Sequence, residues 1–375
     1  MRIVSVCARL ASMPLLCCAG YAHAALPTQE PMTIDGGPLG PLEYNVGVDG
    51  LAFVQSNPPD RDKTAGFQLG NALINISRTT GILRATVTVG GYSGLVLGVA
   101  PGASTPDGQN YTPFSPLYNG YVSIVPNEHI QFSVGQMGTP EGWESALDWN
   151  NYSIFHSMIA FVEPGQSRGA RIAFDEGPFS GVVQIDDGYY SRRINYFQWL
   201  FTYAFSPSFS ITINGAEHLS TTGPFVDGIG NLLYNNSELY GGWVTLSHGN
   251  FTVTPEIQYV YTNPVHKYAP AAAVAGFSAN FTSGVFADYT FAGTPYQLGG
   301  FVEYATSTPS ARDGAGGDWF GFGPGSSLWG GAITPTWVYG KIFARADLAY
   351  AHVNTTYGDG VKSRFYGIAE IGLLY

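Results

Sequence analysis

The chain is poor in charged residues and in cysteine. Only 11% of its 375 residues are charged, less than half of the roughly 25% found in ordinary soluble domains. The cysteines are Cys7, Cys17 and Cys18, all near the start, so the rest of the chain offers neither disulfides nor thiol chemistry. The few charges are mostly acidic, with a formal net charge of −11. This acidic excess argues against nucleic acid as a partner.

Long hydrophobic runs are also missing. No segment after the N-terminal region approaches the roughly 18 unbroken apolar residues of a membrane helix, and the longest candidate, APAAAVAGF at 269–277, is about half as long. We find no spaced His/Glu metal set and no phosphate-binding glycine loop, so we expect no metal and no cofactor. The 49 glycines are attributed to turns and strand curvature. If the chain enters a membrane, it must do so as strands.

The first 24 residues have the pattern of a secretory signal. Arg2 and Arg9 give a basic start, a short apolar stretch follows, and Ala22-His23-Ala24 forms a small-residue cleavage site. We therefore predict a cleaved signal peptide at 1–24, a mature chain beginning at Ala25, a periplasmic N-terminal segment at 25–41 and a membrane domain at 42–375.

Alternating apolar and polar residues recur from Tyr44 onward, whereas convincing amphipathic helices are hard to find. The clearest example is FSANFTSGVFADYTF, in which Phe277, Phe281, Val285 and Tyr289 share one face. This alternation is longer than an ordinary strand of about 5 or 6 residues and fits a tilted membrane-spanning strand of about 9 to 11 or more. The pattern predicts an all-β fold.

The connections between these segments alternate between short turns and long loops, as in a transmembrane barrel with turns at one rim and loops at the other. We predict an antiparallel up-and-down β-barrel of about sixteen strands. A count of fourteen to eighteen strands stays open, because the alternation is poor in three segments, 65–77, 237–247 and 327–338. The predicted strands are 42–55, 65–77, 82–92, 116–125, 130–138, 167–175, 178–188, 194–206, 209–217, 237–247, 251–262, 274–292, 296–306, 327–338, 341–353 and 364–375.

Charges in these strands lie on the more polar face, which we assign to an aqueous lumen. The candidates for the lumen wall are Arg171, Glu256, Asp288, Glu303, Arg345, Asp347, Arg364 and Glu370. Acids outnumber bases on this face, which predicts a mild preference for cations. Arg171, Arg345 and Arg364 could face loop acids across the lumen. Alternatively, they could form structural salt bridges with Asp175, Asp347 and Glu370, and both interpretations stay open.

The final stretch, IAEIGLLY, alternates up to the last residue. We expect it to be the closing strand, paired with the first strand near Tyr44, because strands can span a membrane only as a barrel without edges. It is similar to the closing strands of known outer-membrane proteins, which the assembly machinery reads. That similarity implies an assembly signal at Phe365, Ile371, Leu373 and Tyr375.

A more specific resemblance lies in VGQMGTPEGWESALDWNNYSIFHSMIAFVEPGQSRGARIAF. This stretch resembles the OmpL-like β-barrel porin family, with matching positions at Gly135, Thr139, Pro140, Gly142, Glu144, Pro164 and Gly169. Gln136 stands where the resemblance implies a lysine. What the family implies is an outer-membrane barrel that passes small solutes.

The same stretch contains the longest loop, 139–166. Its acidic and aromatic residues include Glu141, Glu144, Asp148, Glu163, Trp143 and Trp149. In general porins a third loop folds into the pore, so by similarity these residues are candidates for the pore constriction. An ordered surface cap whose acids face bulk water is an equal alternative.

We interpret the chain as an outer-membrane channel for passive diffusion of small hydrophilic solutes or ions, not an enzyme, with no catalytic residues. Its expected partners are outer-membrane lipids, the barrel-assembly machinery and the solutes, and a homotrimer stays open. One alternative is a barrel without an open pore, such as an adhesin, a structural protein or a rim enzyme using His218 with Ser220 or His352 with Asn354. A soluble secreted β protein is the other.

Overall fold

A computed structural model describes residues 26, 30–58, 63–99, 116–223, 232–265, 267, 276–308, 318–323, 325–355 and 360–375. The predicted signal peptide and Ala25 lie outside the described residues.

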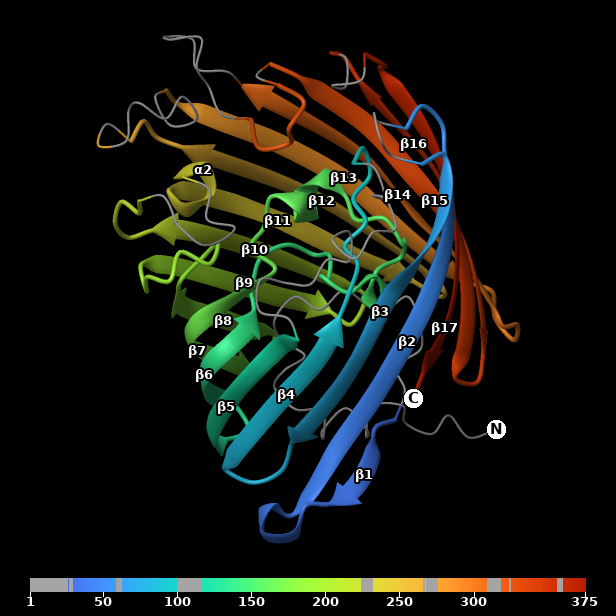
Figure 1. Ribbon diagram of the computed structural model, residues 1–375. Coiled ribbons are helices and arrows are strands. Elements are labelled where there is room, and N and C mark those ends of the chain that lie inside the picture. Colours follow the sequence, from blue (N-terminus) through green and yellow to red (C-terminus); the bar gives the residue numbers. More distant parts are fainter. Residues whose placement is uncertain are drawn as a thin grey trace.

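Sixteen antiparallel strands of the described chain close into a barrel, as predicted (Figure 1). A short additional strand, β1, pairs only with the beginning of β2. The strands are β1 Met32–Asp35, β2 Pro41–Gln55, β3 Ala65–Arg78, β4 Leu83–Gly91, β5 Leu117–Asn127, β6 Ile130–Gly138, β7 Gln166–Glu176, β8 Phe179–Asp186, β9 Tyr196–Ser206, β10 Phe209–His218, β11 Ser237–His248, β12 Phe251–Thr262, β13 Ser278–Thr290, β14 Tyr296–Thr308, β15 Ser327–Tyr339, β16 Ile342–Val353 and β17 Ser363–Leu374.

The seam between β17 and β2 closes the barrel. Pairing runs from Tyr366 opposite Gln55 to Leu374 opposite Gly47. It continues through Tyr375, whose carbonyl accepts from the Val46 N–H at 2.6 Å and whose N–H donates to the Val46 carbonyl at 2.7 Å. The prediction of a closing strand is confirmed. Closure leaves no unpaired edge, which a sheet in hydrocarbon requires.

Side chains alternate between an apolar outer face and an inner face. Val302, Ile333 and Leu348 are 62%, 60% and 68% exposed on the outside, where lipid would surround them. The segments that alternate poorly in sequence are nevertheless regular strands. In β11 and β15 the pairs at 241–242 and 330–331 are glycines, which carry no side chain to signal a face.

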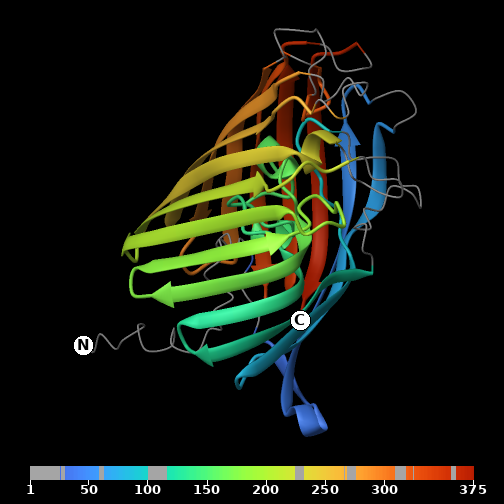
Figure 2. The ribbon, with the colours of Figure 1, turned by 90° about the vertical axis from the view of Figure 1, so that its left-hand side faces the viewer.

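The barrel wall is lower on one side. Strands β4 to β8 have 8 to 11 residues, whereas β2 and β3 have 15 and 14 and β11 to β17 have 12 or 13. Short turns connect the strands at one end and longer loops at the other (Figure 2).

Helical structure is limited to single turns among the described residues. These are the 3-10 turns η3 Gly37–Leu39 and η5 Asp148–Asn150, and the helices α1 Met158–Phe161 and α2 Leu232–Asn235. Within the described ranges, no helix has the length and apolar character needed to cross a membrane. Two of these turns, η5 and α1, belong to the long connection between β6 and β7, residues 139–165, which we call L3. Its green ribbon lies inside the ring of strands in both views (Figures 1 and 2).

Candidate functional site

L3 occupies the barrel interior rather than its surface. Every residue from Asn151 to Ile159 is buried, and Phe155 and Met158 have no exposed surface. The surface-cap alternative is therefore wrong, because the acids of L3 do not face bulk water: Glu141, Glu144 and Asp148 are 5%, 8% and 3% exposed.

Carboxylates on the inner wall hold the backbone of L3. One Asp347 oxygen accepts hydrogen bonds from the N–H groups of Ile154 and Phe155 at 3.1 and 2.9 Å and from the Ser153 hydroxyl at 2.7 Å. The sequence placed Asp347 on an aqueous wall, and that expectation is wrong for this residue. A loop inside a barrel cannot leave its N–H groups unpaired, and the wall carboxylates supply the acceptors.

Two further wall carboxylates act in the same way. Glu256 on β12 accepts from the Trp143 N–H at 3.0 Å, and Glu303 on β14 accepts from the Met158 N–H at 2.6 Å. Both are buried, so the predicted water-facing role is wrong for them too. Trp143 packs against Phe286, with ring centroids 4.6 Å apart, which places this tryptophan in the apolar core of the lumen.

Arg345 on β16 forms the ionic anchor of L3. Its guanidinium lies 2.6 Å from the Asp148 carboxylate of L3 and 2.7 Å from the Glu370 carboxylate of β17, and it also donates to the Asp148 carbonyl at 2.9 Å. Both alternatives for this arginine are therefore partly right, because it pairs on the wall and also meets a loop acid. Its wall partner is Glu370 rather than Asp347. All three side chains are buried, so removing one would leave an uncompensated charge.

A second anchor lies beside the seam. The Trp149 ring donates its N–H to Asp49 on β2 at 2.7 Å, and Asn71 on β3 donates to both Asp49 and Asp148 at 2.8 and 2.6 Å. The β2–β3 register shifts between Val48 and Gly50. A bulge of this kind re-aims a side chain, which accounts for the position of Asp49.

Glycines in the wall make room for L3. A side chain at Gly47 would collide with the Trp149 ring, and one at Gly299 with the Tyr152 backbone. A side chain at Gly330 would instead meet the Tyr350 carbonyl of β16 and the Leu97 side chain of the β4–β5 connection. From the sequence, the glycines are attributed to turns and strand curvature. That interpretation is wrong for Gly47 and Gly299, because these two strand glycines leave the space that L3 occupies.

Other connections pack onto L3 from the loop end. Segment 95–97 pairs with His156, whose N–H donates to the Leu95 carbonyl at 2.7 Å and whose carbonyl accepts from the Leu97 N–H at 2.9 Å. Tyr189, after β8, donates to the Val162 carbonyl at 2.5 Å. Sequence reasoning missed these contacts, although the apolar run around Leu95 and Leu97 in a glycine-rich stretch was a signal for the first.

The remaining candidates lie apart from the centre of L3. Arg364 donates to the Asn57 carbonyl, after β2, at 3.1 Å, and Asp288 on β13 is partly buried. Arg171 on β7 donates to Gln184 at 2.6 Å and to the Gly138 carbonyl. Side chains of the predicted assembly signal lie on the outer face: Phe365, Ile371, Leu373 and Tyr375 are 63%, 63%, 40% and 43% exposed. Their role in assembly stays a prediction.

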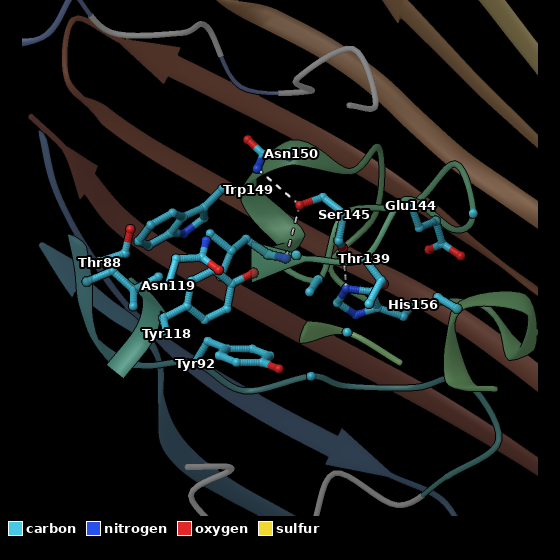
Figure 3. A pocket seen from close by; sticks show the side chains of 18 of the residues that line it. Thr88, Tyr92, Tyr118, Asn119, Thr139, Glu144, Ser145, Trp149, Asn150 and His156 are labelled. Carbon is cyan, nitrogen blue, oxygen red and sulfur yellow. Dashed lines mark hydrogen bonds between the residues drawn. The ribbon is translucent and has the colours of Figure 1, made fainter. Parts of the chain in front are cut away.

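A cavity of about 630 Å³ remains between L3 and the wall formed by β2 to β7 (Figure 3). Its lining extends from Tyr92, directly after β4, to Leu374 and Tyr375 at the end of β17. Because β4 ends at the loop end of the barrel and β17 at the turn end, the lining includes residues near both ends of the wall. Leu26 also lines it, is 2% exposed, and donates its N–H to the Trp149 carbonyl at 3.4 Å. The segment we placed in the periplasm thus reaches the lumen at this residue.

Three acids of L3 line the cavity and lie in a water-poor environment. Burial raises the pKa of Glu141 well above its usual value, and nearby Asp186 raises it further. Burial also raises the pKa of Glu144, although His156 and hydrogen bonds from Ser157 partly offset the effect. For Glu163, burial and then the neighbouring Glu141 raise the pKa well above its usual value.

The histidine pairs considered for catalysis are not assembled. His352 contacts the Ser363 hydroxyl at 2.8 Å, whereas Asn354 accepts from the Ser327 N–H. His218 lies 3.8 Å from the Glu238 carboxylate. Across the described residues, no group of three or more acidic or histidine side chains is placed to hold a metal ion.

A sixteen-stranded barrel with an apolar exterior and an inward-folded third loop defines a porin-type protein of the outer membrane. The sequence matches the family described as "Putative beta-barrel porin-2, OmpL-like" over residues 42–374. The chain therefore belongs to this family, and the resemblance inferred from residues 134–174 is confirmed.

Solved structures with the same fold share little sequence. An anion-selective porin from Comamonas acidovorans is 12% identical, with a TM-score of 0.61 over 89% of this chain and 99% of that one. The in-vitro folded outer-membrane protein OmpT of Vibrio cholerae is 9% identical, with a TM-score of 0.59 over 92% and 100%. The outer-membrane channel DcaP of Acinetobacter baumannii is 10% identical, with a TM-score of 0.57 over 89% and 97%. No curated protein matches the chain.

Proposed function

We propose that the protein is a channel for passive diffusion of small hydrophilic solutes and ions, and that its passage is the cavity between L3 and strands β2 to β7. The observation that carries the proposal is the extent of this cavity, from Tyr92 to Tyr375. The opposite side of the lumen is filled by apolar side chains of L3 and the wall, among them Trp143, Phe155 and Phe286. Membership of a porin family supports a channel rather than a catalyst.

The six constriction candidates divide into two roles in this proposal. Glu141, Glu144, Glu163 and Trp149 line the passage and would set its width and charge. Asp148 holds L3 to Arg345, and Trp143 packs it against the wall. Three acids face the passage against one lining arginine, Arg171, but burial raises the pKa of each of the three. We therefore expect a mild cation preference that increases as pH rises and these acids ionise.

The test is single-channel recording of the refolded chain from Ala25 to Tyr375 in a planar bilayer under a KCl gradient. We expect steady ohmic steps and a reversal potential on the cation side. A folded, heat-modifiable barrel that passes no current would reject the channel. Measured at high pH, where these acids ionise, the double variant Glu141→Gln/Glu163→Gln should reduce the cation preference, while the turn variant Glu128→Gln, whose carboxylate is exposed, should not. An unchanged reversal potential in the double variant would reject the role of L3 in ion selectivity.

A homotrimer stays a prediction. Among the structures of similar fold, OmpT of Vibrio cholerae has been solved in a trimer form. Light scattering of the detergent-purified barrel, with the mass of bound detergent subtracted, would distinguish one copy from three.

A further inference from the structure

The charged strand residues that hold L3 do not line the cavity. The wall carboxylates that bind L3, and Arg345, come from β2, β12, β14, β16 and β17. In the described chain, strands β2 to β5 contribute only uncharged side chains to the cavity. These are Asn45, Val46, Leu73, Asn75, Thr88, Tyr118 and Asn119. A solute moving along this wall would therefore meet amides, a hydroxyl and aromatic rings instead of fixed charges.

The amides of this wall offer both donors and acceptors. Thr88 donates its hydroxyl to the Asn75 side-chain oxygen at 2.9 Å. The Asn119 side-chain oxygen is buried and lacks a hydrogen-bond partner within the part of the chain that the structure describes. A buried acceptor without a partner is costly, and a rotation of this amide, which lines the cavity, would let its oxygen accept a hydroxyl of a bound solute. Amide and hydroxyl groups suit hydroxylated solutes because each kind of group can donate and accept.

The aromatic rings beside these amides are fixed in place. Tyr92 and Tyr118 meet edge to face with centroids 5.2 Å apart. Trp149 is held by its hydrogen bond to Asp49 and packs in one cluster with Tyr118 and Leu73. Figure 3 shows the three rings on the same side of the cavity as Asn119 and Thr88. Rigid rings beside a few placed polar groups are typical of small-molecule sites, and sugar rings present C–H faces that pack on such surfaces.

The charged groups that line the cavity are largely neutralised or engaged within the protein. Glu144 accepts from the Ser157 N–H and hydroxyl, and Glu163 accepts from Gln258 at 2.5 Å. Arg171 donates to Gln184. Burial raises the pKa of Glu141 well above its usual value, which favours its uncharged form. The site therefore presents little net charge to a bound solute.

We propose that this cavity is a binding site for a neutral saccharide, whose ring faces lie against Tyr118 and Trp149 and whose hydroxyls bond to Asn119, Asn75 and Thr88. The inference rests on the proposed channel and names its solute class. The cavity volume of about 630 Å³ falls within the roughly 300–1,000 Å³ range of small-molecule sites.

The test measures the ion current of the open channel while maltose is added, with a polyethylene glycol of similar hydrodynamic size as the control. We expect maltose to reduce the current in a saturable way and the polyethylene glycol to do so only in proportion to its concentration. Tyr118→Leu and Asn119→Leu should each raise the half-blocking maltose concentration about tenfold. The matched variant Asn214→Leu, which removes a buried amide of β10 outside the cavity, should leave it unchanged.

Calorimetric titration of the detergent-solubilised protein with maltose separates the two proposals. Saturable heat without any ion current would support the saccharide site and reject the channel. A conducting channel with neither saturable block nor heat would reject the saccharide site and keep the channel. Saturable block by choline but not by maltose would also overturn it, in favour of a cationic solute.

Discussion

The contacts of Asp347 make the position of L3 testable by one substitution. In Asp347→Ala, Ser153, Ile154 and Phe155 lose a shared acceptor. Hydrogen bonds to charged groups contribute about 1.5–3 kcal/mol each, but the released groups regain water when the loop moves. We therefore expect a net loss of about 3 kcal/mol for the packed position of L3.

A loss of about 3 kcal/mol raises the ratio of displaced to packed loop by about 150-fold, since each 1.4 kcal/mol is a factor of ten. If L3 is displaced for about 0.1% of the time in the unmodified protein, within the usual range for a minor state, the variant would have it displaced for more than a tenth of the time. Single-channel records should then show frequent transitions to a larger conductance, because the apolar plug formed by L3 leaves the lumen.

The matched control is Asp187→Ala. Asp187 is also a buried acid, and the three hydrogen bonds that it accepts come from Arg168 rather than from L3. It should leave the conductance levels unchanged. If Asp347→Ala folds as a heat-modifiable barrel and its records match those of the unmodified protein, the wall carboxylate does not hold the loop.

Three further predictions concern the cavity and L3. Burial raises the pKa of Glu141, so packed L3 keeps a proton that a released loop would give up. The packing of L3 should therefore be strongest at acid pH and weaken as pH rises above the ordinary glutamate pKa of about 4.3. Open-channel noise should grow from pH 4.5 to 8, and the same pH dependence of the noise in Glu141→Gln would contradict this. Leu26→Ala should widen the passage and raise the conductance, since Leu26 lines the cavity; an unchanged conductance would place this residue outside the ion path. Gly142 has a φ of +70°, and a side chain there would meet the Glu163 carboxylate. Gly142→Ala should therefore lower the folding stability by more than the roughly 1–2 kcal/mol of left-handed strain alone. The control Gly177→Ala, at φ +60° with open space around it, should lower the midpoint of heat modification less, and equal shifts would argue against the contact.

The barrel itself could be predicted from sequence because its signal is local. Alternation of side chains depends only on neighbours two residues apart, so Phe281, Val285 and Tyr289 indicate a lipid-facing strand without knowledge of any partner strand. The same local rule assigned Asp347 and Glu303 to the inner face. The order of short turns and long loops then fixed which strands pair, because consecutive antiparallel strands are joined directly.

The interior could not be predicted in this way because its contacts join residues far apart in the chain. Asp148 meets Arg345 across 197 positions, and nothing near either residue shows that a loop would enter the lumen. The wall glycines were ambiguous for the same reason, since Gly47 is explained only once Trp149 is placed beside it. Leu26 has no periodic pattern around it that would direct it into a cavity.

L3 is anchored on both sides of the seam between β2 and β17. Trp149 bonds to β2, the first strand of the barrel, whereas Asp148 bonds to Arg345, which in turn holds Glu370 on the last strand. The seam is thus fastened twice, by the backbone ladder within the wall and by the loop across its inner side. Separation of β2 from β17 would have to break buried ionic contacts in the lumen as well as strand hydrogen bonds. The loop that narrows the barrel therefore also acts as a brace against its opening.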